Sequence, residues 1–232
     1  MTEQGKRSIL LIGDSFGIER QYQGQIYVPA EQTWPQQVKR HFADWQIETD
    51  FKSFRRYVEL PELIQQQWPD VSIVVLHAGI VDCYPRPLSA KITRSTHSVH
   101  RTLRRIVRKM RRFWLNYLYN RPWSEPPAIE VATERLLKIG QKTPLVVITP
   151  SPVLTSEYRN TPGAQDAIIN FANHLRQLSG SPNITLLDLH AEFMATPFEK
   201  YLHAKDAHFN QAGNDYLARR VIAVLEQLTE KV

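Results

Sequence analysis

The stretch VSIVVLHAG, residues 71–79, constrains the fold more than any other part of this chain. It is an apolar, β-branched run that ends at a glycine, without the regular alternation of a half-exposed strand. Such a run is typical of a strand buried on both faces, which occurs mainly in parallel sheets covered by helices. We therefore expect an α/β protein with a parallel central sheet.

Further apolar runs recur along the chain and alternate with segments of helical pattern. Pro35, for example, stands where the first turn of a helix tolerates proline. This alternation predicts a parallel sheet with helices on both faces, connected by right-handed crossovers. Strands are predicted at 9–12, 46–54, 71–79, 144–152 and 184–193, and helices at 35–45, 60–70, 97–120, 128–141, 164–180 and 210–232.

The length of 232 residues suits one α/β domain that buries a full core without disulfides or metals. We expect a single domain over residues 1–232, with a basic helical insertion at about 90–128. The single cysteine, Cys83, excludes an internal disulfide and a cysteine-based zinc cluster. No apolar stretch has the length of a signal peptide or a membrane span, so we expect a cytoplasmic protein, with peripheral attachment to a membrane through its insertion as the alternative.

The first apolar run leads directly into Gly13-Asp14-Ser15. A strand that ends in such a tight turn is one way to lift a serine hydroxyl into solvent at the edge of a sheet. The alternative is an ordinary strand-to-helix turn in which Asp14 or Ser15 caps the next helix. Ligand sites of parallel sheets lie at the carboxyl ends of the strands, where the polar residues of 79–82 and 206–208 are also expected.

A serine hydroxyl becomes a useful nucleophile when a base takes its proton and a carboxylate orients that base. Asp206 and His208 stand two residues apart in a loop just before the last predicted helix. Asp206 is then able to hold the imidazole of His208 while the other ring nitrogen faces Ser15. The alternative is that Asp206 caps the last helix.

At this point the chain resembles the GDSL-like, or SGNH, hydrolases. The block LLIGDS matches their nucleophile block at Ser15, the block DAHFNQAGNDYLA resembles their last block, and VVLHAGIVDC keeps Gly79 and Asp82 of their third block. The resemblance implies a flavodoxin-like α/β/α sandwich with about five parallel strands. It also implies ester chemistry through Ser15, His208 and Asp206, with no metal or organic cofactor.

The chain departs from the family pattern at three places. Val81 replaces the third-block asparagine, and the second block, KSFRRYVEL, has no glycine, so two donors to the oxyanion are missing. Lys205 occupies the usual place of the aspartate, because Asp206 stands one residue later. Loss of one oxyanion donor typically costs about 10²–10³ in rate. Either a guanidinium of Arg55 or Arg56 substitutes for these donors, or both arginines are surface residues.

The loop GIVDCYPRP, residues 79–87, is expected beside Ser15. Gly79 would contribute to the oxyanion pocket, and Asp82 would accept hydrogen bonds from backbone N–H groups and shape the loop. Arg86 would bind a carboxylate or phosphate of the substrate. Nothing around Cys83 favours a lowered thiol pKa, so we interpret it as a structural residue.

The segment 101–112 is strongly basic and accounts for much of the formal net charge of +6. Apolar residues recur in it at three- and four-residue steps, which predicts an amphipathic helix with a cationic face. Three interpretations remain open: a surface helix with solvated charges, attachment to an anionic membrane surface, or contact with a polyanionic substrate. Nucleic acid is ranked last among these partners, because the chain has no nucleic-acid-binding module.

The main hypothesis is therefore a serine-dependent esterase or O-acyltransferase that acts on a short acyl ester, such as O-acetyl on a carbohydrate. The alternative is a catalytically weak or inactive relative. Such a protein would use its pocket or basic helix to bind an anionic glycan or a membrane surface.

Overall fold

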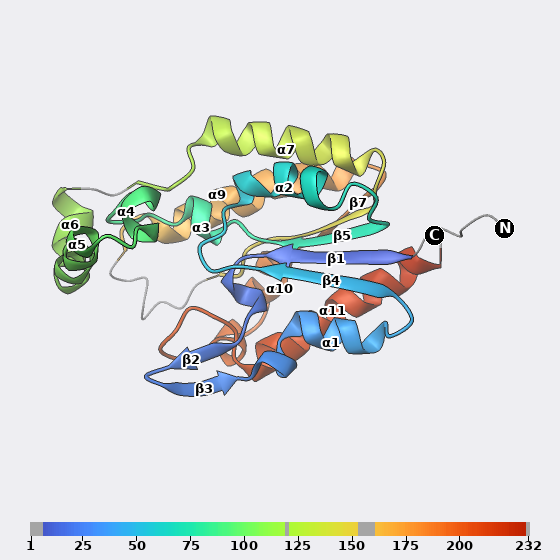
Figure 1. Ribbon diagram of the computed structural model, residues 1–232, viewed down its shortest axis with the longest axis horizontal. Helices are drawn as coiled ribbons and strands as arrows, with labels where there is room; N and C mark the ends of the chain where they lie inside the picture. The colour runs from blue at the N-terminus through green and yellow to red at the C-terminus, as the bar shows by residue number, and fades with distance from the viewer. Residues whose placement is uncertain (1–6, 119–120, 153–160, 231–232) are drawn as a thin grey trace.

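The computed structural model describes residues 7–118, 121–152 and 161–230 (Figure 1). Its centre is a five-stranded sheet in the order β4-β1-β5-β6-β7, and every pair of neighbours is parallel. The predicted parallel α/β sheet is thereby confirmed. The strands are β1 (Ser8–Gly13), β4 (Gln46–Phe51), β5 (Ile73–His77), β6 (Leu145–Ile148) and β7 (Ile184–Leu187).

Helices enclose the sheet on both faces, as the apolar strands require. The helices α2 (Leu60–Gln67), α7 (Pro126–Gly140) and α9 (Ala164–Arg176) lie above the sheet in Figure 1. The helices α1 (Trp34–His41) and α11 (Gln211–Thr229) lie below it. Every residue of β5 and β6 is buried between these layers. The chain thus forms the three-layer α/β/α sandwich that its resemblance implied.

Several short elements that the sequence did not predict surround the carboxyl end of the sheet. The hairpin of β2 (Arg20–Tyr22) and β3 (Gln25–Val28) turns at Gln23 and Gly24, which both have positive φ. Short helices are α3 (Ile80–Cys83), α4 (Ala90–Arg94) and α10 (Leu189–Met194). Single 3-10 turns lie there at Ser15–Gly17, Ala30–Gln32, Tyr57–Glu59 and Phe198–Tyr201, whereas the turn Gln177–Gly180 extends the predicted helix α9 (Ala164–Arg176) ahead of β7, at the other end of the sheet.

The prediction of a last strand over 184–193 is wrong in its second half. β7 ends at Leu187, and the side chain of Asp188 accepts a hydrogen bond from the Ala191 N–H, which caps α10. A capping aspartate stops the strand because it satisfies an N–H at the start of a helix instead.

The prediction of one basic helix over 97–120 is also wrong. The structure has two helices there, α5 (Ser98–Lys109) and α6 (Arg111–Tyr117), which are separated at Met110, and residues 119–120 of the predicted helix lie outside the described residues. Just after this break, Arg111 donates hydrogen bonds to Tyr84 and Thr161 in the body of the protein. Among the described residues, no helix has both the length and the apolar character to cross a bilayer.

The parallel strands bring distant parts of the chain to one edge. Gly13, at the end of β1, lies beside Phe51 of β4 on one side and His77 of β5 on the other. The arrowheads of β1 and β4 point toward the end of the molecule that carries the β2–β3 hairpin, α3 and α4 (Figure 1). The residues that follow β1 and β5 therefore meet at this edge.

Candidate active site

Ser15 lies immediately beyond β1, in a turn fixed by its neighbours. The Asp14 N–H donates to the His77 carbonyl at 3.2 Å, and the Asp14 side chain accepts from the Phe16 N–H at 3.1 Å. A Cβ on Gly13 would overlap the same His77 carbonyl, so only glycine fits this approach of two strands. Asp14 thus caps the turn, and the hydroxyl of Ser15 stays half-exposed.

The loop that carries His208 is fixed separately, just before α11. Asn210, not Asp206, caps this helix, since its side-chain oxygen accepts from the Gly213 N–H at 3.0 Å. The amide nitrogen of Asn210 also donates to the carbonyls of Lys200 and Leu202. The capping role that the sequence left open for Asp206 is therefore filled by another residue, which leaves its carboxylate available to the histidine.

Ser15, His208 and Asp206 form one chain of hydrogen bonds. Ser15 Oγ lies 2.8 Å from His208 Nε2, and His208 Nδ1 lies 2.6 Å from Asp206 Oδ1. An ionised carboxylate only accepts, so Nδ1 carries the proton and Nε2 is left to accept from the serine hydroxyl. This is the arrangement in which an imidazole acts as a general base toward a serine.

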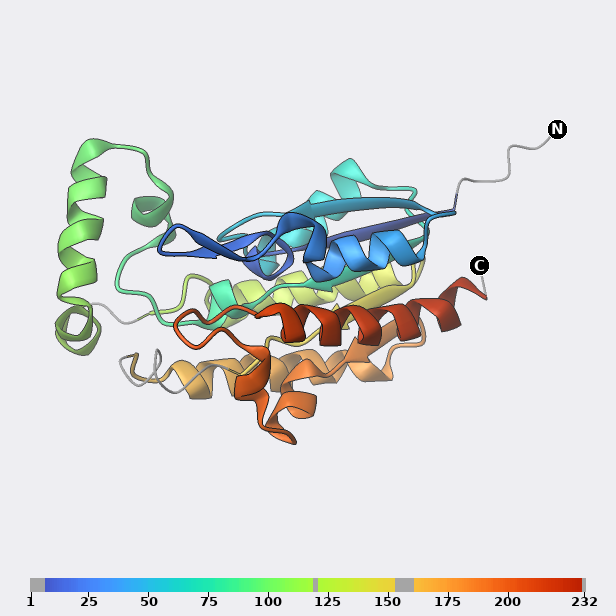
Figure 2. The same ribbon diagram turned by 90° about the horizontal axis from the view of Figure 1, so that it is seen from below.

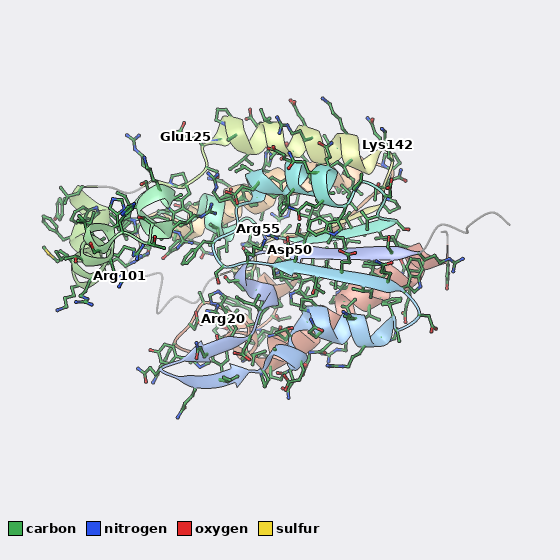
Figure 3. The ribbon with its side chains drawn as sticks, viewed as in Figure 1. Arg20, Asp50, Arg55, Arg101, Glu125 and Lys142 are labelled. Atoms are coloured by element: carbon green, nitrogen blue, oxygen red, sulfur yellow. The ribbon has the colours of Figure 1, made fainter. Side chains whose placement is uncertain are left out.

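The β2–β3 hairpin adds two groups to this arrangement. Arg20 Nη2 and the Tyr27 hydroxyl each donate to Asp206 Oδ2, both at 2.8 Å. The same Arg20 nitrogen lies 2.9 Å from His208 Nδ1. Both of these nitrogens are donors when Nδ1 carries its proton, so the carboxylate of Asp206 is the acceptor that they share. Figure 3 shows Arg20 on the hairpin, at the sheet edge.

The surroundings set the charges of this group of residues. Burial alone would raise the pKa of Asp206, but the hydrogen bonds and charges of His208 and Arg20 hold it well below its usual range. Burial lowers the pKa of His208; the hydrogen bond to Asp206 opposes this, and the charge of Arg20 reinforces it. The pKa of His208 is lowered overall, so at neutral pH the imidazole is uncharged and Nε2 is free to accept a proton.

Two further ionisable groups lie beneath Ser15. Burial raises the pKa of Asp14 to about 7, and burial lowers the pKa of His77 to about 3. His77 is therefore neutral at physiological pH, and Asp14 is only partly ionised. The Phe16 ring separates this layer from the site above, since it packs against His77 at 5.4 Å and His208 at 4.9 Å between centroids.

The structure pairs Arg55 and Arg56 with carboxylates. Arg55 is buried, and its guanidinium forms an ion pair with the Asp50 carboxylate at 2.8 Å and donates a hydrogen bond to the Asp50 carbonyl at 2.6 Å. Arg56 bonds Glu59 at 2.9 Å. Figure 3 shows Arg55 beside Asp50, at the end of β4. Both guanidinium groups are thus engaged at the neighbouring strand end, and a role at the oxyanion stays a prediction.

Asp82 is buried in the loop after β5. It accepts from the Tyr57 N–H and from the Ser124 hydroxyl, each at 2.5 Å. Burial raises its pKa to about 6, against the lowering effect of these hydrogen bonds. Asp82 therefore links α3 to the loop that contains Tyr57 and to the segment before α7. One of its two hydrogen bonds comes from a backbone N–H, as the sequence predicted. The neighbouring Cys83 is buried, and burial raises the pKa of its thiol.

Arg86 lies over three aromatic rings, with its guanidinium carbon 4.8 Å from the Trp123 centroid, 5.1 Å from that of Tyr84 and 5.9 Å from that of Phe54. Such stacking holds a guanidinium in place. After burial and the charge of Arg20, the charge of Arg86 also lowers the pKa of His208. Arg86 thus acts electrostatically on the same histidine as Arg20.

Gly79 is the N-cap residue just before α3, with a φ of 128°, and a Cβ there would overlap the Phe171 ring. Gly79→Ala is expected to lower the free energy of unfolding by roughly 2–5 kcal/mol, because backbone strain and overpacking add. Urea unfolding measures this difference. Gly180→Ala, where a Cβ meets no atom within 4 Å, is the matched control and should change stability by less than about 1 kcal/mol. An equally small effect at Gly79 would contradict the expectation.

Sequence reasoning missed Arg20 and Tyr27. The segment 18–28 has no strong periodicity, and its one structural signal is the Gln23-Gly24 pair, which suits the turn of a hairpin. Nothing in the sequence links that hairpin to Asp206, which lies more than 170 residues away along the chain. Within the ranges that the structure describes, no three His, Cys, Asp or Glu side chains gather as a metal site.

Comparison with known proteins gives a consistent result. The model of the GDSL-like Lipase/Acylhydrolase family matches residues 11–216. No curated protein sequence matches the chain. A lipase/acylhydrolase from Enterococcus faecalis has a similar structure, with 16% identity, a TM-score of 0.58, and coverage of 95% of this chain and 96% of that one.

Two esterase structures are similar to a comparable degree. A carbohydrate acetylesterase family member from Sinorhizobium meliloti has 13% identity, a TM-score of 0.60, and coverage of 95% and 98% of the two chains. A catalytic mutant of an acetylxylan esterase from Geobacillus stearothermophilus has 15% identity, a TM-score of 0.59, and coverage of 96% and 95%. At such low identity these likenesses establish the shared fold.

Proposed function

This chain belongs to the GDSL-like Lipase/Acylhydrolase family of ester-hydrolysing enzymes, and from this premise we propose that Ser15, His208 and Asp206 are its catalytic triad. The observation that carries the proposal is the hydrogen-bonded chain from Ser15 Oγ through the imidazole to the Asp206 carboxylate. A serine, a neutral imidazole and an ionised carboxylate in this order suit acyl transfer better than any other chemistry.

In the first half of the reaction, Ser15 Oγ attacks the ester carbonyl while His208 Nε2 takes the hydroxyl proton. Asp206 holds the ring in the correct tautomer and stabilises the imidazolium that forms. The tetrahedral intermediate then collapses to an acyl-serine, and His208 gives its proton to the leaving alcohol. In the second half, His208 deprotonates water or another hydroxyl, which attacks the acyl-serine and releases Ser15.

The oxyanion pocket is proposed to contain the backbone N–H groups of Ser15 and Gly79, which follow adjacent strands. The third-block asparagine has no counterpart in Val81, which is an aliphatic residue with only 2% of its surface exposed. Arg86 is the side chain that we propose to supply positive charge near the developing oxyanion or near an anionic group of the substrate. Preorganised charge of this kind stabilises an oxyanion without a metal or an organic cofactor.

The proposed substrate is a short acyl ester, such as O-acetyl on a carbohydrate. The similar folds of a carbohydrate acetylesterase family member and an acetylxylan esterase support this choice. Both water and a sugar hydroxyl are chemically competent acceptors for the acyl group, so hydrolysis and O-acyl transfer belong to the same proposal.

A substrate series tests the proposal. Nitrophenyl esters of increasing acyl length and an acetylated xylo-oligosaccharide are incubated with the protein, and a fluorophosphonate probe reports on the nucleophile by peptide mass spectrometry. We expect acetate release, a preference for the shortest acyl chain, and probe attachment at Ser15. No turnover above that of His208→Ala, together with no labelling of Ser15, would favour the non-catalytic binding protein instead.

A further inference from the structure

The two helices α5 and α6 carry apolar side chains that point into solvent. Val99 and Ile106 of α5, Met110 between the helices, and Phe113 and Tyr117 of α6 are exposed by between 47% and 74%. The buried contacts of the same segment come from other positions, Val107 and Leu115. An apolar row that is separate from the buried face is not explained by packing against the rest of the protein.

A cationic row runs along α5, beside the exposed Val99 and Ile106 of that helix. Arg101, Arg105 and Lys109 follow one another at intervals of four residues along α5, and all three are exposed. Residues 98–118 contain seven arginines and lysines but no aspartate or glutamate. No acidic side chain of the segment itself therefore neutralises this row.

Two other arginines of the segment have structural roles. Arg104 donates hydrogen bonds to the carbonyls of Ile92, Thr93 and Ser95 at the end of α4. Arg111 bonds Tyr84 and Thr161. These arginines hold the helices to the body, so the exposed rows belong to an anchored arm. The side chains of Arg108 and Arg112 lie outside the part of the chain that the structure describes.

The arm stands at the same end of the molecule as the carboxyl ends of the strands. In Figure 1, α5 and α6 lie beyond α4, on the side to which β1 and β4 point. Figure 2 shows α5 running across this end, apart from the helix layers, while α11 ends at the opposite side. Arg101 lies at this outer end in Figure 3.

We propose that the arm of residues 98–118 docks the protein on an anionic lipid bilayer, with its apolar row inserted among the acyl chains and its cationic row on the headgroups. Helices with adjacent apolar and basic faces lie in membrane interfaces in this way. An acidic glycan would satisfy the cationic row but would leave the apolar row in water. An antiparallel second copy of the arm would cover the apolar row but bring two cationic rows together.

Docking would turn the end of the molecule that carries the triad toward the bilayer. The proposal does not depend on catalysis, because it is carried by the arm alone. Ser15→Ala should therefore bind vesicles as the unchanged protein does, and a loss of ester hydrolysis would leave the docking proposal intact.

Vesicle flotation tests the proposal with the full chain. Vesicles of phosphatidylcholine, with and without phosphatidylglycerol, are mixed with the protein at low and high salt. We expect binding only to the phosphatidylglycerol vesicles, and at least a tenfold weaker binding constant at high salt, because exposed charges are screened. Equal binding to neutral vesicles, or no binding to either kind, would overturn the proposal.

Paired variants separate the two rows. Arg101→Glu with Arg105→Glu is expected to weaken binding roughly thirtyfold, and Ile106→Ser with Phe113→Ser roughly tenfold. The matched controls are Arg135→Glu with Lys138→Glu for charge, and Val131→Ser with Met194→Ser for apolar surface, since all four residues are exposed outside the arm. The controls should bind as the unchanged protein does, and losses equal to those of the arm variants would contradict the proposal.

Two results would assign the arm to another partner and overturn membrane docking. One is a loss of vesicle binding in the charge variant alone, combined with tight binding to an acidic polysaccharide. The other is a dimer in analytical ultracentrifugation that dissociates when Ile106 and Phe113 become serine. A fluorophore at Tyr117→Cys reports insertion directly, because the native cysteine, Cys83, is buried and resists labelling.

Discussion

Ser15→Ala is expected to lower kcat/KM for a nitrophenyl acetate ester by on the order of 10⁴-fold or more, with the fold unchanged. The reason is that the acyl-serine cannot form without Oγ, and only binding and oxyanion stabilisation remain. Removal of Oγ frees His208 Nε2, but Ser15 and His208 are both only partly buried, so water can take the place of the hydroxyl and the fold should be kept. Initial rates and circular dichroism spectra of both proteins measure the effect.

Ser179→Ala is the matched control. Ser179 is exposed, and its hydroxyl donates to the Arg176 carbonyl, within α9 and its 3-10 extension. This variant should retain full activity and full labelling by a fluorophosphonate. If Ser15→Ala kept more than about a tenth of the activity, the turnover would have to come from another nucleophile and the triad would be rejected.

The predicted fold depended on local patterns that tertiary packing reinforces. The apolar runs of β1, β5 and β6 are buried between the helix layers. Because only a strand covered on both faces needs such a run, the pattern in the sequence correctly predicted the layers. The error in β7 arose because the apolar pattern continues through Leu189 and Phe193, which are buried residues of α10. Burial alone does not distinguish a short strand from a short helix.

The predicted site depended on a geometric argument of the same kind. Ser15 follows β1, which lies between β4 and β5 in the sheet, and the loop before α11 returns to this edge to place His208 2.8 Å away. The motif and the topology together were sufficient for these two residues. The oxyanion donors were less accessible to sequence reasoning, because a backbone N–H has no residue type that signals its position.

Arg20 and Tyr27 were not predictable, because their contacts with Asp206 come from a hairpin with no chemical motif. The spacing of Asp206 two residues before His208 was visible in the sequence, but the two donors at its second oxygen were not. The Asp206 carboxylate receives hydrogen bonds from His208, Arg20 and Tyr27. These three donors hold it in a fixed orientation although it is carried by a loop.

Arg20→Met is expected to lower kcat/KM at neutral pH by roughly 10–100-fold and to move the acidic limb of the pH profile to higher pH. The rate falls because Asp206 loses a charge-assisted hydrogen bond that orients it, and such bonds contribute about 1.5–3 kcal/mol. The profile of kcat/KM between mildly acidic and neutral pH, measured on a nitrophenyl ester, separates the two effects.

The direction of the shift follows from the charges around His208. Burial lowers the pKa of this imidazole, and the guanidinium of Arg20 lowers it further because it repels the imidazolium. Without Arg20, the attraction of Asp206 for the imidazole proton is opposed by burial and by the charge of Arg86, but no longer by the guanidinium of Arg20. The pKa of His208 therefore rises, and the basic form needed for catalysis is lost at a higher pH than in the unchanged protein.

Three further variants distinguish this electrostatic role from a structural one. Arg20→Lys keeps the positive charge, so its acidic limb should lie close to that of the unchanged protein, although a lysine does not reproduce the planar fork of the guanidinium. Tyr27→Phe removes a hydrogen bond but no charge, so the acidic limb of its pH profile should shift less than that of Arg20→Met. Arg220→Met breaks an exposed ion pair with Glu192 and should leave the profile unchanged. A limb that stays in place in Arg20→Met, or moves to lower pH, would mean that Arg20 supports the loop without acting on the imidazole.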